Sequence, residues 1–196
     1  MKRVVLLGDS IRLGYEPAVR QALGDVALVW GPPTLTLHTF DLLTHFWPWV
    51  VCQHPDVVHL NAGHWDSRRV VRGEDGNVVP PHLYSATLGR LFHLLKAHTQ
   101  AHIVWATTTP AFAEGFEGFV RRHNLPGRNY ADIPLYNAIS LDVARSYNVT
   151  VNDLGAYVEK EGPASLMLSD GIHFTPTGYE QLGIVTADVI RRTWER

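Results

Sequence analysis

Short apolar runs alternate along the whole chain with longer segments that carry a helical apolar stripe. The run Val4 to Leu7 predicts a first buried strand, and similar runs predict four more. Helical spacing is clearest where apolar residues recur every three or four positions. The expected strands are 4–7, 26–30, 57–60, 103–106 and 149–151, and the expected helices are 17–23, 40–51, 83–98, 132–147 and 176–194.

This alternation predicts an α/β fold, a three-layer α/β/α sandwich around a mostly parallel sheet of about five strands. Strands that are apolar throughout are typical of sheets covered on both faces. Ligands of such sheets bind beyond the carboxyl ends of the strands. Two segments without clear periodicity, 65–81 and 111–131, follow strand ends on that edge, so we expect them to be substrate loops.

Composition and charge narrow the class of protein. The chain has 196 residues, 45% of them hydrophobic, with a formal net charge of -2, which predicts no basic surface for nucleic acid. Its single cysteine excludes a framework of internal disulfides. The first apolar run stops at Gly8, too early for a signal peptide, and no stretch approaches the roughly 18 apolar residues of a membrane span. The sequence therefore predicts a soluble, cytoplasmic protein without membrane or nucleic-acid partners.

Two short segments at opposite ends of the chain carry residues suited to nucleophilic catalysis. Ser10 directly follows the first strand, where its hydroxyl is exposed near free backbone N–H groups; a helix cap or a phosphate loop is the alternative. Asp170 stands three residues before His173, a spacing that lets a carboxylate orient an imidazole; a turn with a solvated histidine is the alternative. The G-x-S-x-G elbow is absent, because Arg12 takes the place of its second glycine.

Taken together, the two ends resemble the SGNH (GDSL-like) hydrolase family, and the resemblance extends over essentially the whole chain. Residues 5–10 match the nucleophile motif of that family, and residues 170–179 match its C-terminal Asp-x-x-His pattern. The resemblance implies that Ser10 is the nucleophile, His173 the general base and Asp170 the residue that orients it. It also implies the flavodoxin-like fold of the family and acyl transfer to water without a metal or other cofactor.

The middle blocks of the family match less well. Gly31 is the only glycine at the end of the second strand, and the two prolines after it have no N–H group. The backbone N–H of Gly31 is therefore the expected donor to the oxyanion, and a simple turn glycine is the alternative. The third block, normally Gly-x-Asn-Asp, reads Asn61-Ala-Gly-His-Trp-Asp, so the usual asparagine is missing. We assign Asn61 as the replacement donor beside the Ser10 N–H, with His64 in reserve. A contact of Asn61 with a neighbouring loop alone is the alternative.

His64, Trp65 and Asp66 adjoin the expected pocket and are candidate substrate contacts. The implied activity is that of a serine esterase, in one domain spanning 1–196, that hydrolyses small-acyl esters, acetyl above all, on a small molecule or a carbohydrate. A catalytically inactive binding protein of the same fold, a lipase or thioesterase, and a nucleotide-binding protein are the alternatives. The other histidines lack the spacing of metal ligands, so no metal is expected.

Overall fold

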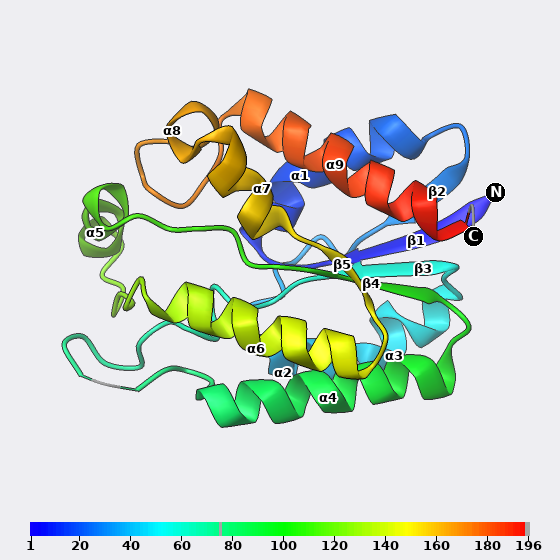
Figure 1. Cartoon of the computed structure of the whole chain (residues 1–196), viewed down its shortest axis with the longest axis horizontal. Coiled ribbons are helices and arrows are strands. Elements are labelled where there is room, and N and C mark those ends of the chain that lie inside the picture. The colour runs from blue at the N-terminus through cyan, green and yellow to red at the C-terminus, as the bar shows by residue number, and fades with distance from the viewer. Residues whose placement is uncertain (75, 195–196) are drawn as a thin grey trace.

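The computed structural model describes residues 1–74 and 76–194, and its centre is a parallel sheet of five strands (Figure 1). The strands are β1 (Lys2–Leu7), β2 (Ala27–Trp30), β3 (Val57–Leu60), β4 (His102–Ala106) and β5 (Thr150–Asn152). Their order is β2-β1-β3-β4-β5, and every neighbouring pair is parallel. The five expected strands and the α/β class are thereby confirmed, in the order typical of flavodoxin-like folds.

Side chains of β1 alternate between the two faces of the sheet and divide the core in two. Val4 and Leu6 pack with α1, α7, α8 and α9, whereas Val5 and Leu7 pack with α2, α3, α4 and α6. Figure 1 shows α1 and α9 on one side of the sheet and α4 and α6 on the other. The helices are α1 (Ser10–Leu23), α2 (Thr39–Thr44), α3 (Phe46–Trp49), η1 (Val51–Gln53), α4 (Pro81–His98), α5 (Ala113–Arg122), α6 (Asp132–Ser146), α7 (Leu154–Glu161), α8 (Pro163–Leu166) and α9 (Pro176–Trp194).

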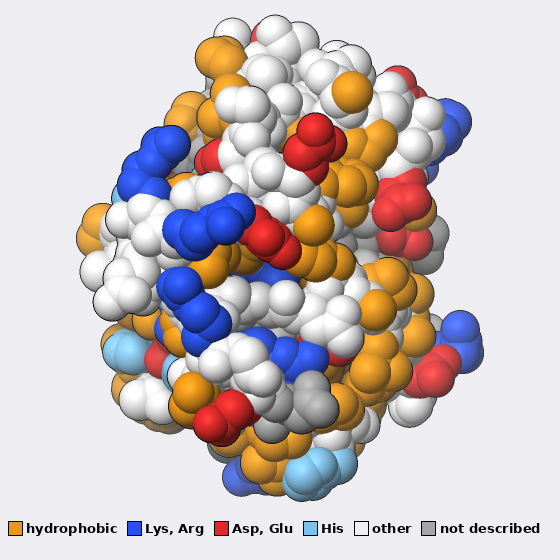
Figure 2. All heavy atoms as spheres, turned by 90° about the vertical axis from the view of Figure 1, so that its left-hand side faces the viewer, with side chains coloured by type: hydrophobic (Ala, Val, Ile, Leu, Met, Phe, Trp, Pro, Cys, Tyr) orange, Lys and Arg blue, Asp and Glu red, His pale blue; other side chains and the backbone are white. Residues whose placement is uncertain are grey.

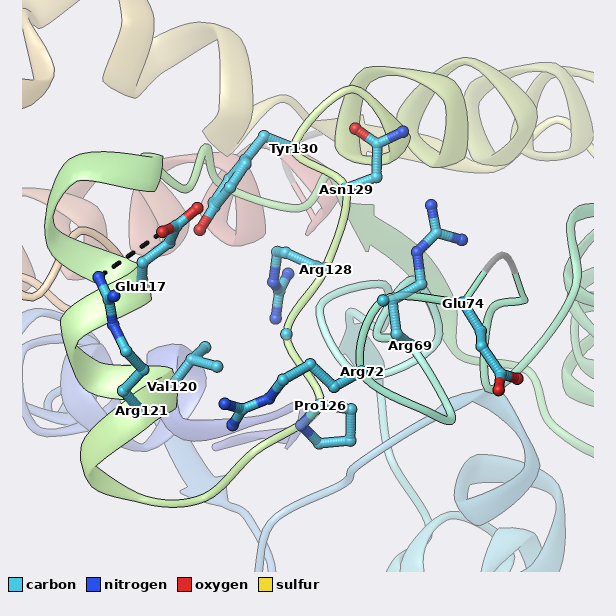
Figure 3. Close-up of a pocket in the computed structure, with 12 residues that line it drawn as sticks. Arg69, Arg72, Glu74, Glu117, Val120, Arg121, Pro126, Arg128, Asn129 and Tyr130 are labelled. Atoms are coloured by element: carbon cyan, nitrogen blue, oxygen red, sulfur yellow. Dashed lines mark ion pairs between the residues drawn. The ribbon is translucent and has the colours of Figure 1, made fainter.

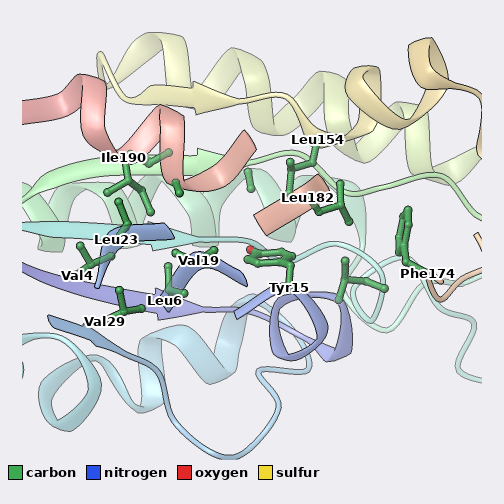
Figure 4. Close-up of a cluster of buried hydrophobic side chains, with 14 of the residues drawn as sticks. Val4, Leu6, Tyr15, Val19, Leu23, Val29, Leu154, Phe174, Leu182 and Ile190 are labelled. Carbon is green, nitrogen blue, oxygen red and sulfur yellow. The ribbon is translucent and has the colours of Figure 1, made fainter. Parts of the chain in front are cut away.

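The cluster between the sheet, α1 and α9 determines where the two ends of the chain meet (Figure 4). Leu6, Tyr15 and Leu182 are almost completely buried there. Gly183 lets the two helices approach closely, because a Cβ at this position would lie 2.4 Å from the Cβ of Ala18. This packing brings the loop before α9 to the edge of the sheet where α1 begins.

Two expected helices have different bounds, for local reasons. α1 begins at Ser10 rather than at Pro17, because the carboxylate of Asp9 accepts a hydrogen bond from the Ile11 N–H (2.9 Å) and caps the helix. The expected helix 40–51 is instead three short pieces, α2, α3 and η1. Pro48, inside α3, lacks the N–H group that a continuous helix needs at this point.

Three helices occupy segments for which the sequence predicted none. α5 lies within 111–131, and its residues Phe116, Phe119 and Val120 pack in a small cluster apart from the sheet. α7 and α8 lie between β5 and α9. In contrast, the described residues of 65–81 form no helix or strand except the first residue of α4, as expected of a loop.

Candidate active site

The candidate site lies at the carboxyl edge of the sheet. β1 ends at Leu7, and the chain turns through Gly8 into α1, which places Ser10 in the first helical turn. The loop before α9 reaches the same edge and is closed by a bridge between Met167 and Phe174. Figure 2 shows this face of the molecule, which is hollowed, with Lys and Arg side chains gathered around the hollow.

Ser10, His173 and Asp170 form a continuous chain of hydrogen bonds. The Oγ of Ser10 lies 3.1 Å from Nε2 of His173, and Nδ1 of His173 lies 2.7 Å from Oδ2 of Asp170. When Asp170 is ionised, Nδ1 carries a proton and donates it to the carboxylate, so Nε2 accepts from the serine hydroxyl. This arrangement can remove a proton from an attacking serine and return it to a leaving group.

The carboxylate of Asp170 is held by its own loop. Its Oδ1 accepts hydrogen bonds from the N–H groups of Ile172 (3.1 Å) and His173 (2.9 Å). Partial burial opposes ionisation, but these bonds and the bond to the imidazole outweigh it, so the pKa of Asp170 lies below its ordinary value. α5 abuts this loop from outside, because a Cβ on Gly115 would lie 2.2 Å from the Ser169 carbonyl oxygen. The helix missing from the sequence-based prediction thus supports the loop of Asp170.

Gly31 lies beside a buried ion pair between Arg12 and Glu16. The guanidinium of Arg12 is 2.5 Å from the Glu16 carboxylate and donates to the carbonyl oxygens of Pro32 and Thr34, at 3.0 Å each. A Cβ on Gly31 would lie 2.7 Å from Oε2 of Glu16 and 3.0 Å from Nη1 of Arg12, so a side chain does not fit here without a shift. Arg12, which in the sequence only marks a missing glycine, therefore holds the loop that begins at Gly31.

Asn61 follows β3, and its side chain lies against the turn that carries the serine. A Cβ on Gly8 would be only 2.7 Å from Oδ1 of Asn61. The pairing of Leu7 with Leu60 in the neighbouring strands brings the two segments together. Oδ1 of Asn61 is buried and has no hydrogen-bond partner among the described residues. This oxygen can only accept, so a hydrogen bond from Asn61 to an oxyanion has to come from the NH₂ group of the same amide.

His64 has both ring nitrogens engaged. Nδ1 lies 2.9 Å from Nη1 of Arg128, and Nε2 lies 3.2 Å from Oγ1 of Thr109. Because a guanidinium only donates, Nδ1 is the acceptor and Nε2 carries the proton. Burial, and to a smaller extent the charge of Arg128, lowers the pKa of His64 well below its ordinary value, so the ring is neutral. Its one N–H is directed at Thr109, which does not favour His64 as the reserve oxyanion donor.

The two residues after His64 have different surroundings. Trp65 lines the pocket, with the guanidinium of Arg68 over its ring at 4.6 Å from the centroid. Asp66 is fully buried and accepts hydrogen bonds from the N–H (2.9 Å) and hydroxyl (2.7 Å) of Thr39. Burial raises the pKa of Asp66 to about 6. Asp66 connects α2 to the site loop and does not line the pocket, so the expected substrate contact is not found there.

A pocket of about 210 Å³ opens onto the serine hydroxyl. Its wall consists of Asp9, Ser10, Leu35, His64, Trp65, Arg68, Phe116, Phe119, Leu125, Arg128, Ile172 and His173. The ring of Phe119 meets the ring of His173 edge-on, with centroids 5.8 Å apart. Four of these residues come from 111–131 and two from 65–81, the two segments that the sequence predicted to be substrate loops.

In the part of the chain that the structure describes, no three or more His, Cys, Asp or Glu side chains are grouped so that they could hold a metal ion. Within the same part, every helix is too short or too polar to cross a membrane.

Several solved structures share this fold over nearly the whole chain. A lipase/acylhydrolase from Enterococcus faecalis has a TM-score of 0.78 at 22% identity, covering 98% of this chain and 97% of its own. The acetyl xylan esterase AlAXEase has a TM-score of 0.75 at 20% identity, with coverages of 96% and 99%. The acetylxylan esterase Axe2 from Geobacillus stearothermophilus has a TM-score of 0.68 at 21% identity, with coverages of 97% and 93%. At these identities the likeness shows the fold.

The shared fold, together with a family model that matches most of the sequence, defines the class of protein: it is a carboxylic-ester hydrolase. A sequence model of the GDSL-like lipase/acylhydrolase family matches residues 6–181. The chain therefore belongs to the GDSL-like lipase/acylhydrolase family, which confirms the resemblance drawn from its two ends. No curated protein sequence matches the chain significantly.

Proposed function

We propose that this protein is a serine esterase in which Ser10 is the nucleophile, His173 the general base and Asp170 the residue that orients the imidazole. The observation that carries the proposal is the chain of hydrogen bonds from Ser10 Oγ through His173 to Asp170, at 3.1 Å and 2.7 Å. Ser10 and His173 line the same pocket, where an ester can reach the hydroxyl.

The reaction proceeds in two steps. Ser10 Oγ attacks the ester carbonyl while Nε2 of His173 takes the hydroxyl proton, and the imidazolium then protonates the departing alkoxide. In the second step the same nitrogen deprotonates a water molecule, which attacks the acyl-serine. The imidazolium then returns this proton to Oγ of Ser10 as the bond between Oγ and the acyl carbon breaks, which releases the acid. Asp170 keeps the proton on Nδ1 and stabilises the positive charge on the ring during both steps.

Three donors are proposed for the oxyanion: the N–H of Ser10, the N–H of Gly31 and the side-chain amide of Asn61. The support for Asn61 is its place against the Gly8 turn that leads to Ser10. The support for Gly31 is that Arg12 holds its loop, and the two prolines that follow it have no N–H group.

Asn61→Ala is expected to lower kcat by roughly 10²–10³, because one preorganised donor to the developing negative charge is lost. KM for an aryl acetate should change little, since the donor acts mainly in the transition state. Steady-state kinetics check this against Gln21→Ala, which removes an exposed amide from the last turn of α1. A loss of less than threefold in Asn61→Ala would assign the donor elsewhere.

The preferred substrate is proposed to be an ester of a small acyl group, such as an acetyl group on a carbohydrate. A pocket of about 210 Å³ is smaller than the roughly 300–1,000 Å³ of sites that enclose larger ligands. Two proteins of the same fold are acetyl xylan esterases. Among 4-nitrophenyl esters from acetate to palmitate, we expect kcat/KM to be highest for acetate and at least about tenfold lower by octanoate. A maximum at long chains would instead indicate a lipase or thioesterase.

Covalent labelling tests the chemistry against the alternative of an inactive binding protein. A fluorophosphonate probe is expected to modify Ser10 alone, because only a serine beside a general base is activated. Peptide mapping by mass spectrometry locates the adduct, and heat-unfolded protein gives the background. Absence of the adduct at Ser10 in folded protein would favour the binding protein.

A further inference from the structure

Two arginines face each other on the wall of the serine pocket. Arg68 and Arg128 are directly opposite in an isolated antiparallel bridge, and both line the pocket that holds Ser10 and His173. Opposed like charges on neighbouring strands destabilise a fold unless something neutralises them. Within the described residues, neither guanidinium forms an ion pair with a carboxylate.

The contacts of both guanidinium groups are neutral. Arg68 lies over the ring of Trp65 at 4.6 Å, and Arg128 lies over the ring of Phe116 at 4.7 Å and donates to neutral His64. The Nε atoms of both arginines are buried without a hydrogen-bond partner in the described part of the chain. Burial lowers the pKa of Arg128 to about 10, which leaves it charged at neutral pH.

Two carboxylates lie near Arg128, those of Asp9 on the wall of the same pocket and of Asp132. Asp9 and Asp132 act on Arg128 through their charges but lie beyond ion-pair distance. Asp9 caps α1 through Oδ1, whereas its Oδ2 is buried without a hydrogen-bond partner in the described part of the chain, and burial raises the pKa of this carboxyl group. Asp132 pairs with Arg69 at 3.3 Å and accepts from Asn77 at 2.7 Å. A partly buried cation without an ion-pair partner at contact distance is costly and favours an anion from outside.

We propose that the pocket binds an anionic group of the ester substrate between Arg68 and Arg128, so that the preferred substrates carry a carboxylate, sulfate or phosphate close to the ester bond. Two guanidinium groups side by side match the oxygens of such groups with short, charge-assisted hydrogen bonds. The inference rests on the proposed esterase function and deepens it, because it names the substrate class of the same site.

A second basic pocket adjoins the first and shares Arg128 (Figure 3). It measures about 510 Å³ and is also lined by Arg72 and Arg121. Glu117 also lines it and pairs with Arg121 at 3.8 Å, whereas Glu74 points away from its centre in Figure 3. An excess of positive charge beside the serine pocket would raise the local concentration of anionic substrates.

Matched pairs of esters test the proposal. For an anion on the alcohol, 4-acetoxybenzenesulfonate is compared with the neutral 4-acetoxybenzenesulfonamide. For an anion on the acyl group, 4-nitrophenyl hydrogen glutarate is compared with 4-nitrophenyl pentanoate. The kcat/KM of each ester is divided by the rate constant for hydrolysis of the same ester by hydroxide, which corrects for differences in intrinsic reactivity. The anionic member of at least one pair should have a kcat/KM about tenfold higher, and this preference should fall as salt rises.

Variants then assign the preference to the two arginines. Arg68→Gln should reduce the ratio of anionic to neutral kcat/KM about tenfold, and Arg68→Lys should retain part of it. Arg128→Gln should act alike, although it also removes a partner of His64, so Arg68→Gln is the cleaner variant. The control is Arg145→Gln, an exposed arginine paired with Asp142 on α6, which should leave the ratio unchanged. Equal rates within both pairs, or a preference that survives Arg68→Gln, would overturn the proposal.

A binding measurement separates this proposal from the esterase proposal. Two anions are added to the Ser10→Ala variant. 4-Hydroxybenzenesulfonate represents an anion on the alcohol, and monomethyl glutarate represents an anion on the acyl group. At least one of them should raise the unfolding temperature of the variant. Arg68→Gln in the same background should remove the increase. If the wild-type protein hydrolyses neutral esters but neither anion binds, the arginine site is wrong and the esterase stands. If an anion binds through Arg68 but no ester is hydrolysed, the esterase is wrong and the anion site stands.

Discussion

Ser10→Ala is expected to lower kcat for 4-nitrophenyl acetate by a factor on the order of 10⁴ or more, while the protein remains folded. The variant removes only the oxygen that lies 3.1 Å from Nε2 of His173, so no acyl-serine can form. The first turn of α1 stays capped, because the cap is the carboxylate of Asp9 and not the serine. Residual activity above the rate in water would then come from the oxyanion donors and substrate binding alone.

The measurement is the initial rate of 4-nitrophenol release, with thermal unfolding to verify the fold. Ser146→Ala is the matched control, since it removes an exposed hydroxyl from α6 that only bonds the Asp142 carbonyl oxygen. The control should keep full activity. A Ser10→Ala protein with more than a tenth of wild-type kcat would exclude this serine as the nucleophile.

Asp170→Asn has the second-largest expected effect, a loss of kcat on the order of 10⁴. Oδ1 of the new amide can still accept from the N–H groups of Ile172 and His173, so the loop keeps its shape. Its NH₂ group, however, faces Nδ1 of the ring, where the carboxylate oxygen lay at 2.7 Å. The imidazole then accepts at Nδ1 and carries its proton on Nε2, which directs an N–H at Ser10 instead of a lone pair.

Kinetics and labelling together test this explanation. Asp170→Asn should lose kcat and fluorophosphonate labelling of Ser10 in parallel, because both need the same acceptor nitrogen. Asp142→Asn removes an exposed carboxylate on α6 and should change neither. If labelling stayed fast while kcat fell, Asp170 would act at a later step than activation of the serine.

The proposed catalytic residues could be identified from the sequence. Of the roles assigned to residues 61–66, the third block of the family, the structure supports only some. The motifs that contain Ser10, Asp170 and His173 are short, so they can be recognised from neighbouring residues in the sequence. These two motifs meet in space because α1 and α9 pack together on one face of the sheet. Asp66 was expected at the substrate and is instead buried against Thr39. Adjacent residues of a loop can point in different directions, and no periodicity indicates which of them faces the pocket.

The sequence by itself determined the strands, most of the long helices and the two terminal motifs, because these depend on neighbours along the chain and on apolar spacing. The order of the sheet, the loop held by Arg12 and the position of α5 against the loop of Asp170 appeared only in the tertiary structure. So did the pairing of Arg68 with Arg128, two loop residues 60 positions apart that no local pattern links. Such contacts depend on how separate elements pack, and packing is a property of the whole fold rather than of any one segment.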